Sequence, residues 1–422
     1  MILNIEGQQV LNGEVSISGA KNSATRVLAA ALLSESEINI RNFPLDLEDV
    51  KAKMAFIRNM GADLHEQHET SELQIRPRDI SFEKIDNFDL PIRTTYLLAA
   101  GALARGNRAL VPYPGGCKIG SRGYDLHLMV WQKMGCTVVE HPDYIEVTGR
   151  LVGSEIDFPI STVGGTENAL MCAAVADGET VIKNAYVTPE VHDLIDFLRE
   201  MGATIELNGR SHVKVTGHGG LFRGASFSIM PDRIEALTWI ILGAVTRSRL
   251  LVRNVPFETM EVPFIHLREA GLDLFRSQND VIVTPDTIGL GGIQPFELAC
   301  GTHPGVISDM QSFFAFLGMF ANGRSLVYDY RYPERIAYAA ELAKFAPSAI
   351  EATRGLITTN GPGRLSGAAV KSTDLRGSMA VIMAAICAQG HSTVEGVELA
   401  LRGYNDLPGK LRDLGVEAEW TA

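Results

Sequence analysis

Hydrophobic and polar positions repeat along the chain in units of roughly 70 residues. In each unit a short strand leads through a polar or glycine turn into a helix rich in Ala and Leu, and a second strand follows. A second helix then ends at a glycine that suits a left-handed C-cap. The strands after these glycines alternate, as in Thr204–Leu207, and are expected to be half-buried. The endings are Met60-Gly61-Ala62, Met134-Gly135-Cys136, Met201-Gly202-Ala203, Ala270-Gly271-Leu272 and Leu414-Gly415-Val416.

Six such units fill the chain, so the pattern predicts six β-α-β-α-β repeats. Their helices are apolar nearly all round, as in Thr95–Leu103 and Ser378–Cys387, which predicts burial inside a domain. Two globular domains of three repeats therefore suit the pattern better than a solenoid, and the absence of a Gly/Ser-rich linker predicts a short join. The repeats begin near Val15–Asn22, Leu90–Arg93, Ile160–Gly165, Met230–Arg233, Ser308–Gln311 and Thr373–Arg376.

Composition narrows the class of protein. The chain has 422 residues, of which 46% are hydrophobic and 21% charged, as in soluble globular proteins. A formal net charge of −12 argues against nucleic acid as a partner. The N-terminus meets a charge at Glu6, too soon for a signal peptide, and no apolar run of about 18 residues predicts a membrane span. Five scattered cysteines without CxxC spacing predict a reduced, cytoplasmic protein with neither a disulfide framework nor a zinc site.

The first predicted helix begins at Ser18-Gly19-Ala20-Lys21-Asn22. A glycine turn into a helix N-terminus exposes backbone N–H groups, and Lys21 adds a full charge, so this segment suits a phosphate or a carboxylate. A simple helix start with a solvated lysine explains the same residues equally well.

The second candidate segment is the glycine-rich loop Tyr113–Arg122, which carries Cys117 beside Lys118. Positive neighbours lower the pKa of a thiol and increase its thiolate fraction, so Cys117 is a candidate nucleophile or general acid. The alternative is an incidental surface thiol. The other four cysteines, which are Cys136, Cys172, Cys300 and Cys387, lie in or beside apolar or regular segments and are expected in the core.

Several repeats place a charged residue at the same point, just before or within the first helical turn. Equivalent positions should face one shared surface, such as a cleft between domains. A carboxylate there could act as a general base and arginines could bind phosphate. Alternatively, Asp232 and Asp374 are N-caps, which we favour for Asp232. The residues are Lys21, Arg93, Asp232, Asp309, Asp374 and Arg376. The paired charges of Arg324–Arg335 are interpreted as exposed faces.

Taken in order, these motifs resemble the UDP-N-acetylglucosamine 1-carboxyvinyltransferase family of enolpyruvyl transferases, over essentially the whole chain. The resemblance rests on the first helix start, the Cys117 loop and five further motifs. These are Asp125-Leu126-His127, Pro231-Asp232-Arg233-Ile234-Glu235, Asp309-Met310-Gln311, Asp374-Leu375-Arg376 and Arg402-Gly403-Tyr404. The resemblance implies a two-domain inside-out α/β barrel with three repeats per domain. Its domains would be residues 21–229 and residues 1–20 with 230–422, and its active site would lie in the cleft between them.

The resemblance also implies a role for each candidate residue. Phosphoenolpyruvate would be held by Lys21, Arg122 and Arg402, with Arg376 close by. Cys117 would be the general acid at the vinyl carbon and the thiol alkylated by fosfomycin. Asp309 would be the base facing the 3-hydroxyl of the sugar. Asn22 would hold the tetrahedral intermediate and the acceptor, and Arg93 would orient the site.

The remaining assignments concern the acceptor. Arg122, Asp125, Leu126 and His127 would line a uridine pocket, while Ser161, Val163 and Gly164 would approach the diphosphate. Val327 and Asp374 complete the substrate-binding set. The implied partners are phosphoenolpyruvate and a UDP-sugar, the implied setting is cytoplasmic peptidoglycan precursor synthesis, and neither a metal nor a cofactor is required.

Some positions depart from the usual family pattern. Gly123 and Tyr124 replace a proline and a small apolar residue before Asp125, and Leu399–Leu401 replace a segment with His and an acidic residue. Ile307 stands where a proline is usual. These changes fall around the acceptor. An alternative is therefore a paralogue that modifies another uridine nucleotide or nucleotide sugar in secondary metabolism. An alternative of a different class is a catalytically silent homologue, which would have no chemical need to retain the predicted acid, base and phosphate ligands.

Overall fold

The computed structural model describes residues 1–85, 87–115 and 123–421. The chain forms two compact units. Unit 1 contains Met1–Ser18 and Pro231–Ala422, and unit 2 contains the described residues of 19–230. The described chain therefore passes from one unit to the other after Ser18 and again after Met230.

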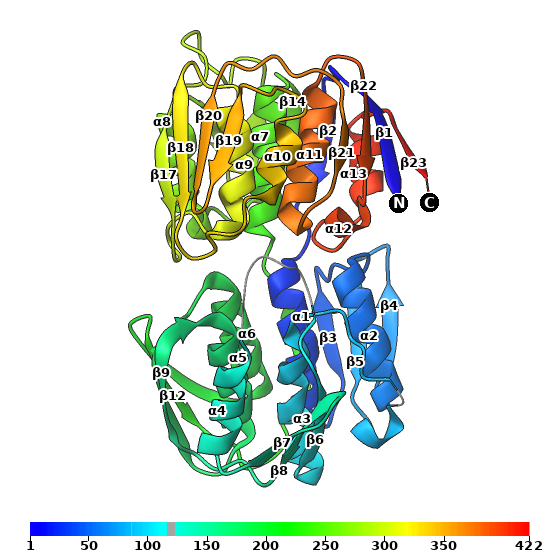
Figure 1. Cartoon of the computed structure of the whole chain (residues 1–422). Helices are drawn as coiled ribbons and strands as arrows, with labels where there is room; N and C mark the ends of the chain where they lie inside the picture. Colours follow the sequence, from blue (N-terminus) through cyan, green and yellow to red (C-terminus); the bar gives the residue numbers. More distant parts are fainter. Residues whose placement is uncertain (86, 116–122, 422) are drawn as a thin grey trace. The chain divides into compact units, whose positions relative to one another are not determined.

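Among its described residues, unit 2 contains eleven strands, and its sheets pair strands from near and distant parts of the chain (Figure 1). Its helical elements are α1 (Lys21–Ala30), η1 (Ala31–Leu33), α2 (Glu48–Met60), η2 (Phe82–Lys84), η3 (Thr94–Leu98), α3 (Ala99–Gly106), α4 (Asp125–Lys133), α5 (Val163–Val175) and α6 (Pro189–Met201). Its strands are β3 (Ile38–Arg41), β4 (Asp63–Gln67), β5 (Glu72–Arg76), β6 (Arg108–Pro112), β7 (Thr137–Glu140), β8 (Tyr144–Thr148), β9 (Glu155–Thr162), β10 (Glu179–Ala185), β11 (Thr204–Asn208), β12 (His212–Thr216) and β13 (Ser226–Ser228), the sheet of β6, β7 and β8 having three strands and the others four.

Unit 1 is built in the same way. Its helical elements are α7 (Arg233–Val245), η4 (Phe257–Thr259), α8 (Glu261–Glu269), η5 (Ser308–Met310), α9 (Gln311–Gly318), α10 (Ala337–Leu342), α11 (Leu375–Cys387), α12 (Glu398–Leu401) and α13 (Leu407–Asp413). Its strands are β1 (Ile2–Glu6), β2 (Asn12–Ser16), β14 (Arg249–Arg253), β15 (Phe275–Ser277), β16 (Asp280–Val283), β17 (Glu297–Cys300), β18 (Arg324–Asp329), β19 (Ile350–Thr353), β20 (Leu356–Asn360), β21 (Ala369–Lys371), β22 (His391–Glu395) and β23 (Ala418–Thr421).

Each unit has three sheets among its described residues, and the sheets with four strands share one design. The second strand in spatial order pairs parallel with an edge strand and antiparallel with the third strand, as β10 does with β9 and β12. In two sheets the parallel edge strand comes from a distant part of the chain, because β13 pairs with β3 and β2 pairs with β14. Both strands immediately precede a passage of the chain between the units.

The sixfold repeat predicted from the sequence is confirmed. Each repeat contributes one buried central element: α1, η3 with α3, and α5 in unit 2, and α7, α9 and α11 in unit 1. Figure 1 shows the sheets of each unit arranged around these helices. One prediction needs refinement, since the helix expected over Thr95–Leu103 begins as the 3-10 segment η3 and becomes α-helical only at Ala99.

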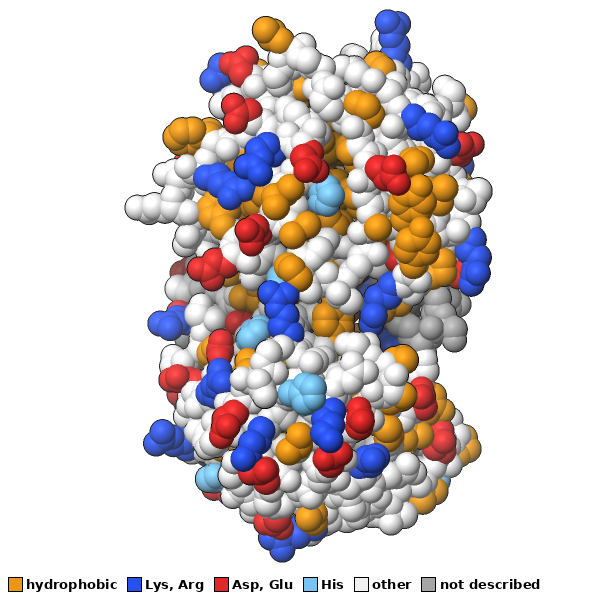
Figure 2. Space-filling model, turned by 90° about the vertical axis from the view of Figure 1, so that its left-hand side faces the viewer, with side chains coloured by type: hydrophobic (Ala, Val, Ile, Leu, Met, Phe, Trp, Pro, Cys, Tyr) orange, Lys and Arg blue, Asp and Glu red, His pale blue; other side chains and the backbone are white. Residues whose placement is uncertain are grey.

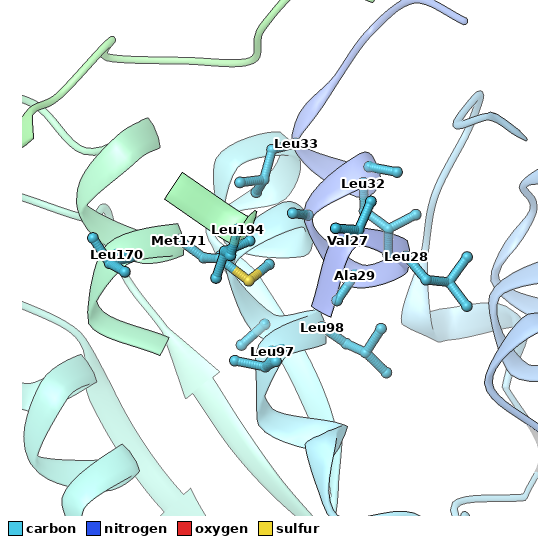
Figure 3. Close-up of a cluster of buried hydrophobic side chains, with 14 of the residues drawn as sticks. Val27, Leu28, Ala29, Leu32, Leu33, Leu97, Leu98, Leu170, Met171 and Leu194 are labelled. Carbon is cyan, nitrogen blue, oxygen red and sulfur yellow. The ribbon is translucent and has the colours of Figure 1, made fainter. Parts of the chain in front are cut away.

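The core of unit 2 lies among its central helices. Val27 and Leu28 of α1, Leu97 and Leu98 of η3, and Leu170 of α5 are fully buried. Figure 3 shows these side chains in one cluster, with Leu194 of α6 beside them. Burying each such side chain contributes about 1.5–3 kcal/mol, so this cluster stabilises the packing of the central helices against one another.

Glycines end the second helix of most repeats as the sequence predicts. Gly61 and Gly202 are the left-handed C-caps of α2 and α6, and Gly135, Gly271 and Gly415 also have positive φ. Another glycine, Gly19, is required for a different reason. A Cβ atom there would lie 1.9 Å from the backbone oxygen of Asn42, so no side chain fits immediately before α1.

The surface carries mixed charge. On the face shown in Figure 2, acidic and basic side chains are interspersed over the lower part of the molecule. Among the described residues, no helix is both long enough and apolar enough to cross a membrane. The described cysteines, Cys136, Cys172, Cys300 and Cys387, are free; the first three are buried, which confirms their predicted place in the core, and Cys387 is partly buried.

Candidate active site

The first candidate segment forms the start of α1, as the sequence predicts. Ala20 is the N-cap and provides no capping side chain, and Lys21 is the first helical residue. The ammonium nitrogen of Lys21 lies 2.8 Å from Oδ2 of Asp49 in α2, and both side chains are largely buried. This ion pair fixes a cation at a helix N-terminus, where the helix dipole favours an anion.

Asn22 follows at the same helix start. Its Oδ1 lies 3.5 Å from Nη1 of Arg26, one turn later. Arg26 in turn donates from Nε to Oε1 of Glu167 in α5 at 2.8 Å. Burial raises the pKa of Glu167, and the charge of Arg26 opposes that shift. The starts of α1 and α5 are thereby joined by an ion pair.

Arg93 and His127 lie together in another part of unit 2. Nη2 of Arg93 donates to the backbone oxygen of Gly123 at 2.8 Å. The ring of His127, in α4, stacks on Tyr96 of η3 with 3.4 Å between ring centroids. Burial, and then the charge of Arg93, lower the pKa of His127 to about 3. The imidazole is therefore neutral near pH 7.

His127 also lies beside the start of α5. A Cβ atom at Gly164 would lie 3.3 Å from Cε1 of His127, so a glycine keeps this approach open. Nδ1 of His127 is buried and makes no hydrogen bond to any residue that the structure describes. A buried polar atom without a partner is costly, which suits a ligand or water at this position. The structure thus brings together four predicted positions: Arg93, His127, Val163 and Gly164.

Thr162, which is the N-cap of α5, is not among the residues predicted from the sequence. Its Oγ1 accepts a hydrogen bond from the backbone nitrogen of Gly165 at 3.3 Å. The predicted Ser161 precedes it and is partly buried at the end of β9. A Thr directly before a glycine-rich helix start is a typical capping signal. Thr162 could therefore have been predicted as an N-cap from the sequence alone.

Unit 1 gathers a second set of predicted residues around Arg335. Its Nη1 lies 2.5 Å from Oδ1 of Asp309, and its Nη2 lies 2.9 Å from Oδ1 of Asp374. Arg335 also donates to the backbone oxygen of Ser308 at 3.2 Å. Burial opposes its charge, but Asp374 and Asp309 together raise its pKa above the ordinary value. The arginine therefore stays charged and holds both carboxylates.

Arg335 corrects an interpretation made from the sequence. The charges of Arg324–Arg335 were expected on exposed faces, yet Asp329 is 1% exposed and Arg335 is 6% exposed. Asp329 accepts hydrogen bonds from the backbone nitrogens of Arg331 and Tyr332, which turns the chain inward before α10. Asp329 and Arg335 lie in a sequence segment that is dense in exposed charged residues, so their burial could not be predicted from the sequence.

Arg376 lies on the other side of Asp309. Its Nε is 3.9 Å from Oδ2 of Asp309, its guanidinium lies over the ring of Tyr404, and it is 2% exposed. Burial opposes its charge, while Tyr404, Asp232 and Asp309 raise its pKa. Asp309 itself is 30% exposed, so its carboxylate is fixed by arginines but still accessible.

The helix-cap alternative is confirmed for both Asp232 and Asp374. Asp232 accepts from the backbone nitrogens of Ile234 and Glu235 at the start of α7. Asp374 accepts from those of Arg376 and Gly377 at the start of α11. Burial raises the pKa of Asp232. Within unit 1 the starts of α7, α9 and α11 therefore meet, as the repeat positions predict.

The remaining candidates have different environments. Arg402 is the C-cap of α12 and is partly buried. Asp125 and Leu126 open α4, where Asp125 is exposed. Val327 lies within β18 and its side chain is 1% exposed, and its place in the substrate-binding set stays a prediction. Cys117 and Arg122 lie outside the described residues.

The sequence model of a family described as EPSP synthase (3-phosphoshikimate 1-carboxyvinyltransferase) matches residues 5–411. The chain belongs to this family of enolpyruvyl transferases. A UDP-N-acetylglucosamine 1-carboxyvinyltransferase of Campylobacter hominis is 35% identical over 420 residues, which cover 99% of this chain and 98% of the relative. The enzyme so named from Nitratiruptor sp. is 34% identical over 422 residues, with the same coverage.

Solved structures agree on the fold. The enolpyruvyl transferase NikO from Streptomyces tendae has a TM-score of 0.88 and 24% identity, covering 100% of this chain and 98% of that one. EPSP synthase from Acinetobacter baumannii has a TM-score of 0.76 and 17% identity, with full coverage of both chains. The fold of this chain is thus the two-domain inside-out α/β barrel of the family.

Proposed function

We propose that this protein transfers the enolpyruvyl group of phosphoenolpyruvate to the 3-hydroxyl of UDP-N-acetylglucosamine and releases phosphate. Support comes from relatives of that name that are 33–35% identical over nearly their whole length. The observation that carries the chemistry is the carboxylate of Asp309, which is accessible and held by the buried Arg335.

Asp309 would act as the general base. It would take the proton of the sugar 3-hydroxyl while the oxygen attacks C2 of phosphoenolpyruvate. Cys117 would deliver a proton to C3, which completes a tetrahedral intermediate. Loss of a C3 proton and cleavage of the C2–O bond would then release phosphate and leave the vinyl ether. A positioned base and acid of this kind typically contribute about 10²–10⁴-fold each to the rate.

Cationic side chains would bind the anionic substrate. Lys21, fixed by Asp49 at the start of α1, would bind phosphoenolpyruvate together with Arg122 and Arg402. Arg376 would contribute to the same charge, and Asn22 would hold the intermediate. Holding the reactants and the base in one geometry lowers the barrier by removing the entropy cost of encounter.

The acceptor would be bound by residues of unit 2. The neutral His127, stacked on Tyr96, has an unpartnered ring nitrogen that suits a hydrogen bond from or to a ligand. Val163 and Gly164 open α5, whose N-terminal backbone nitrogens suit a diphosphate. Arg93 would orient this region through Gly123.

The test is phosphate release from phosphoenolpyruvate with a panel of acceptors, namely UDP-N-acetylglucosamine, UDP-glucose, UDP and UMP. The proposal expects release only with UDP-N-acetylglucosamine, and an Asp309→Asn variant should lose at least about 10²-fold in kcat. The exposed Asp63→Asn substitution provides a control. Absence of release with every acceptor would rule out catalysis and leave the silent-homologue hypothesis.

A second candidate is the same chemistry on another uridine nucleotide. It is favoured by Tyr124, whose hydroxyl donates to Oε2 of Glu140 at 2.7 Å and whose ring packs edge-on against Tyr113. This ordered aromatic ring directly precedes Asp125, where a small apolar residue is usual in the family. Release with UMP or another nucleotide, but not with UDP-N-acetylglucosamine, would select this candidate.

The proposal includes the cellular context. The product would be a peptidoglycan precursor made in the cytoplasm, and fosfomycin would alkylate Cys117. Incubation with fosfomycin should add one inhibitor mass to the protein and none to a Cys117→Ser variant. Equal addition to both would place the reactive thiol elsewhere.

A further inference from the structure

Lys53 is a buried lysine that the proposed chemistry does not use. It lies in α2 and is 0% exposed. Its ammonium nitrogen donates to the backbone oxygen of Thr25 at 2.6 Å, and to the backbone oxygen and Oγ1 of Thr94, each at 3.1 Å. Three acceptors match the three protons of an ammonium group, so every donor of Lys53 is used.

The surroundings make this lysine costly to keep. Burial, and then the charge of Arg26, lower the pKa of Lys53 well below its ordinary value, while Glu167 opposes the shift. Its three hydrogen-bond partners are neutral oxygens. Long charged side chains are rarely fully buried unless they bind specific partners, so a purely apolar side chain would fill this space at less cost.

The partners of Lys53 explain what it holds. Along α2, Asp49 and Lys53 are four residues apart; along α1, Lys21 and Thr25 are also four residues apart. Asp49 forms an ion pair with Lys21, and Lys53 donates a hydrogen bond to the backbone oxygen of Thr25. Two successive turns of α2 therefore contact two successive turns of α1. The third segment in contact begins at Thr94, directly after Arg93.

We propose that Lys53 is a positioning residue, which fixes the first turns of α1 and the Arg93–Thr94 segment so that Lys21 is held in place for an anionic substrate. This inference rests on the proposed function only in naming phosphoenolpyruvate as that substrate. Lys53 touches no reacting atom, and its effect is transmitted through the Thr25 and Thr94 carbonyl oxygens.

The Lys53→Met variant tests this role, because methionine fills a similar linear volume without donating hydrogen bonds. Lys51→Met is the matched control, since Lys51 lies on the same helix, is 47% exposed and pairs with the exposed Glu48. The primary readout is the apparent Kd for phosphoenolpyruvate, from the dependence of the unfolding temperature on ligand concentration.

We expect Lys53→Met to raise this apparent Kd about tenfold, equivalent to about 1.4 kcal/mol, and Lys51→Met to leave it unchanged. In turnover, KM for phosphoenolpyruvate should rise more than KM for the acceptor. If Lys53 only supported packing, the variant would unfold at a lower temperature without ligand but would keep the wild-type Kd, and that result would overturn the inference.

A second variant covers the case in which Lys53→Met fails to fold. Thr94→Val removes one of the three acceptors and keeps the lysine and the side-chain shape. It should raise the apparent Kd about threefold, and an unchanged Kd would contradict the positioning role. The binding measurement needs no turnover, so a wild-type protein that binds phosphoenolpyruvate without releasing phosphate would refute the proposed function alone. A wild-type protein that binds none would refute this inference.

Discussion

At the scale of single residues, the site depends on arginines that fix carboxylates. Arg335 binds Asp309 and Asp374 at once, and Arg376 approaches Asp309 from a second direction. A carboxylate held in this way keeps its orientation without losing access to solvent. Such an arrangement would position the proposed base in advance, and charged groups that are fixed in advance make a large contribution to electrostatic catalysis.

Replacing Arg335 with methionine should separate these effects from simple packing. The change removes the positive charge that binds both the buried Asp374 and Asp309. We expect kcat to fall about 10²-fold and the free energy of unfolding to fall by about 3 kcal/mol. Steady-state kinetics and urea unfolding provide the two measurements.

The control for this prediction is Arg354→Met. Arg354 pairs with Glu334 on the surface and is 75% exposed, and exposed pairs contribute little to stability. An Arg335→Met variant that retained more than half of the wild-type kcat would show that Asp309 does not depend on Arg335.

The sequence revealed some of these residues and concealed others. Asp309 and Arg376 occupy repeat positions, so their pattern marks them. Arg335 occupies no such position, and its contacts depend on the inward turn at Asp329, which only the folded chain shows. Lys53 was missed because a single lysine in an amphipathic helix normally faces solvent.

At the scale of elements, the helix starts organise the molecule. Five glycine-ended helices and two aspartate caps follow directly from local sequence, because capping chemistry acts within a single turn. The 3-10 start of η3 was not predictable in this way, since Thr94–Leu98 are apolar or β-branched residues whose conformation is set by packing. Capping residues in the local sequence therefore determine where helices begin and end. Tertiary packing determines whether the first turn of a helix is 3-10 or α-helical.

The start of α1 is also tied to α6, which leads to a pH-dependent prediction. Oδ2 of Asp193 accepts hydrogen bonds from Ser23 Oγ and from the backbone nitrogen of Met230, and burial raises the pKa of Asp193 to about 6. A carboxyl group whose pKa is raised on folding stabilises the protein most at low pH. That contribution is lost as the pH rises from about 4 to about 6.

Asparagine cannot titrate, and its amide oxygen can accept the same two hydrogen bonds. The stability of Asp193→Asn relative to the wild type should therefore increase by about 2 kcal/mol between pH 4 and pH 7.5. Urea unfolding across this range measures the difference. Asp196→Asn, on the same helix but 60% exposed, should show no such trend. A constant difference for Asp193→Asn would mean that its pKa is not raised.

At the scale of the whole molecule, the internal repeat accounts for the architecture. Each of the six repeats buries one central helical element, and in each unit three sheets among the described residues surround these elements. The sixfold repeat could be predicted from the sequence because each repeat has the same pattern of hydrophobic and polar positions. The parallel pairs β2–β14 and β13–β3 could not be predicted from the sequence, because pairing across about 200 residues leaves no local signal.

Membership of the family does not by itself determine which acceptor substrate the protein uses. The proposed base and the proposed cationic ligands of phosphoenolpyruvate match the family pattern, whereas Gly123 and Tyr124 depart from it beside the predicted uridine pocket. Measuring the chemical product therefore distinguishes the two candidate functions more directly than any single substitution.

The most direct test is mass spectrometry of the reaction of the purified protein with phosphoenolpyruvate and UDP-N-acetylglucosamine. We predict that the nucleotide sugar gains one carboxyvinyl group, that one phosphate is released for each group transferred, and that Asp309→Asn forms far less product. A nucleotide sugar that stays unmodified after prolonged incubation with the folded wild-type protein would contradict the proposed function.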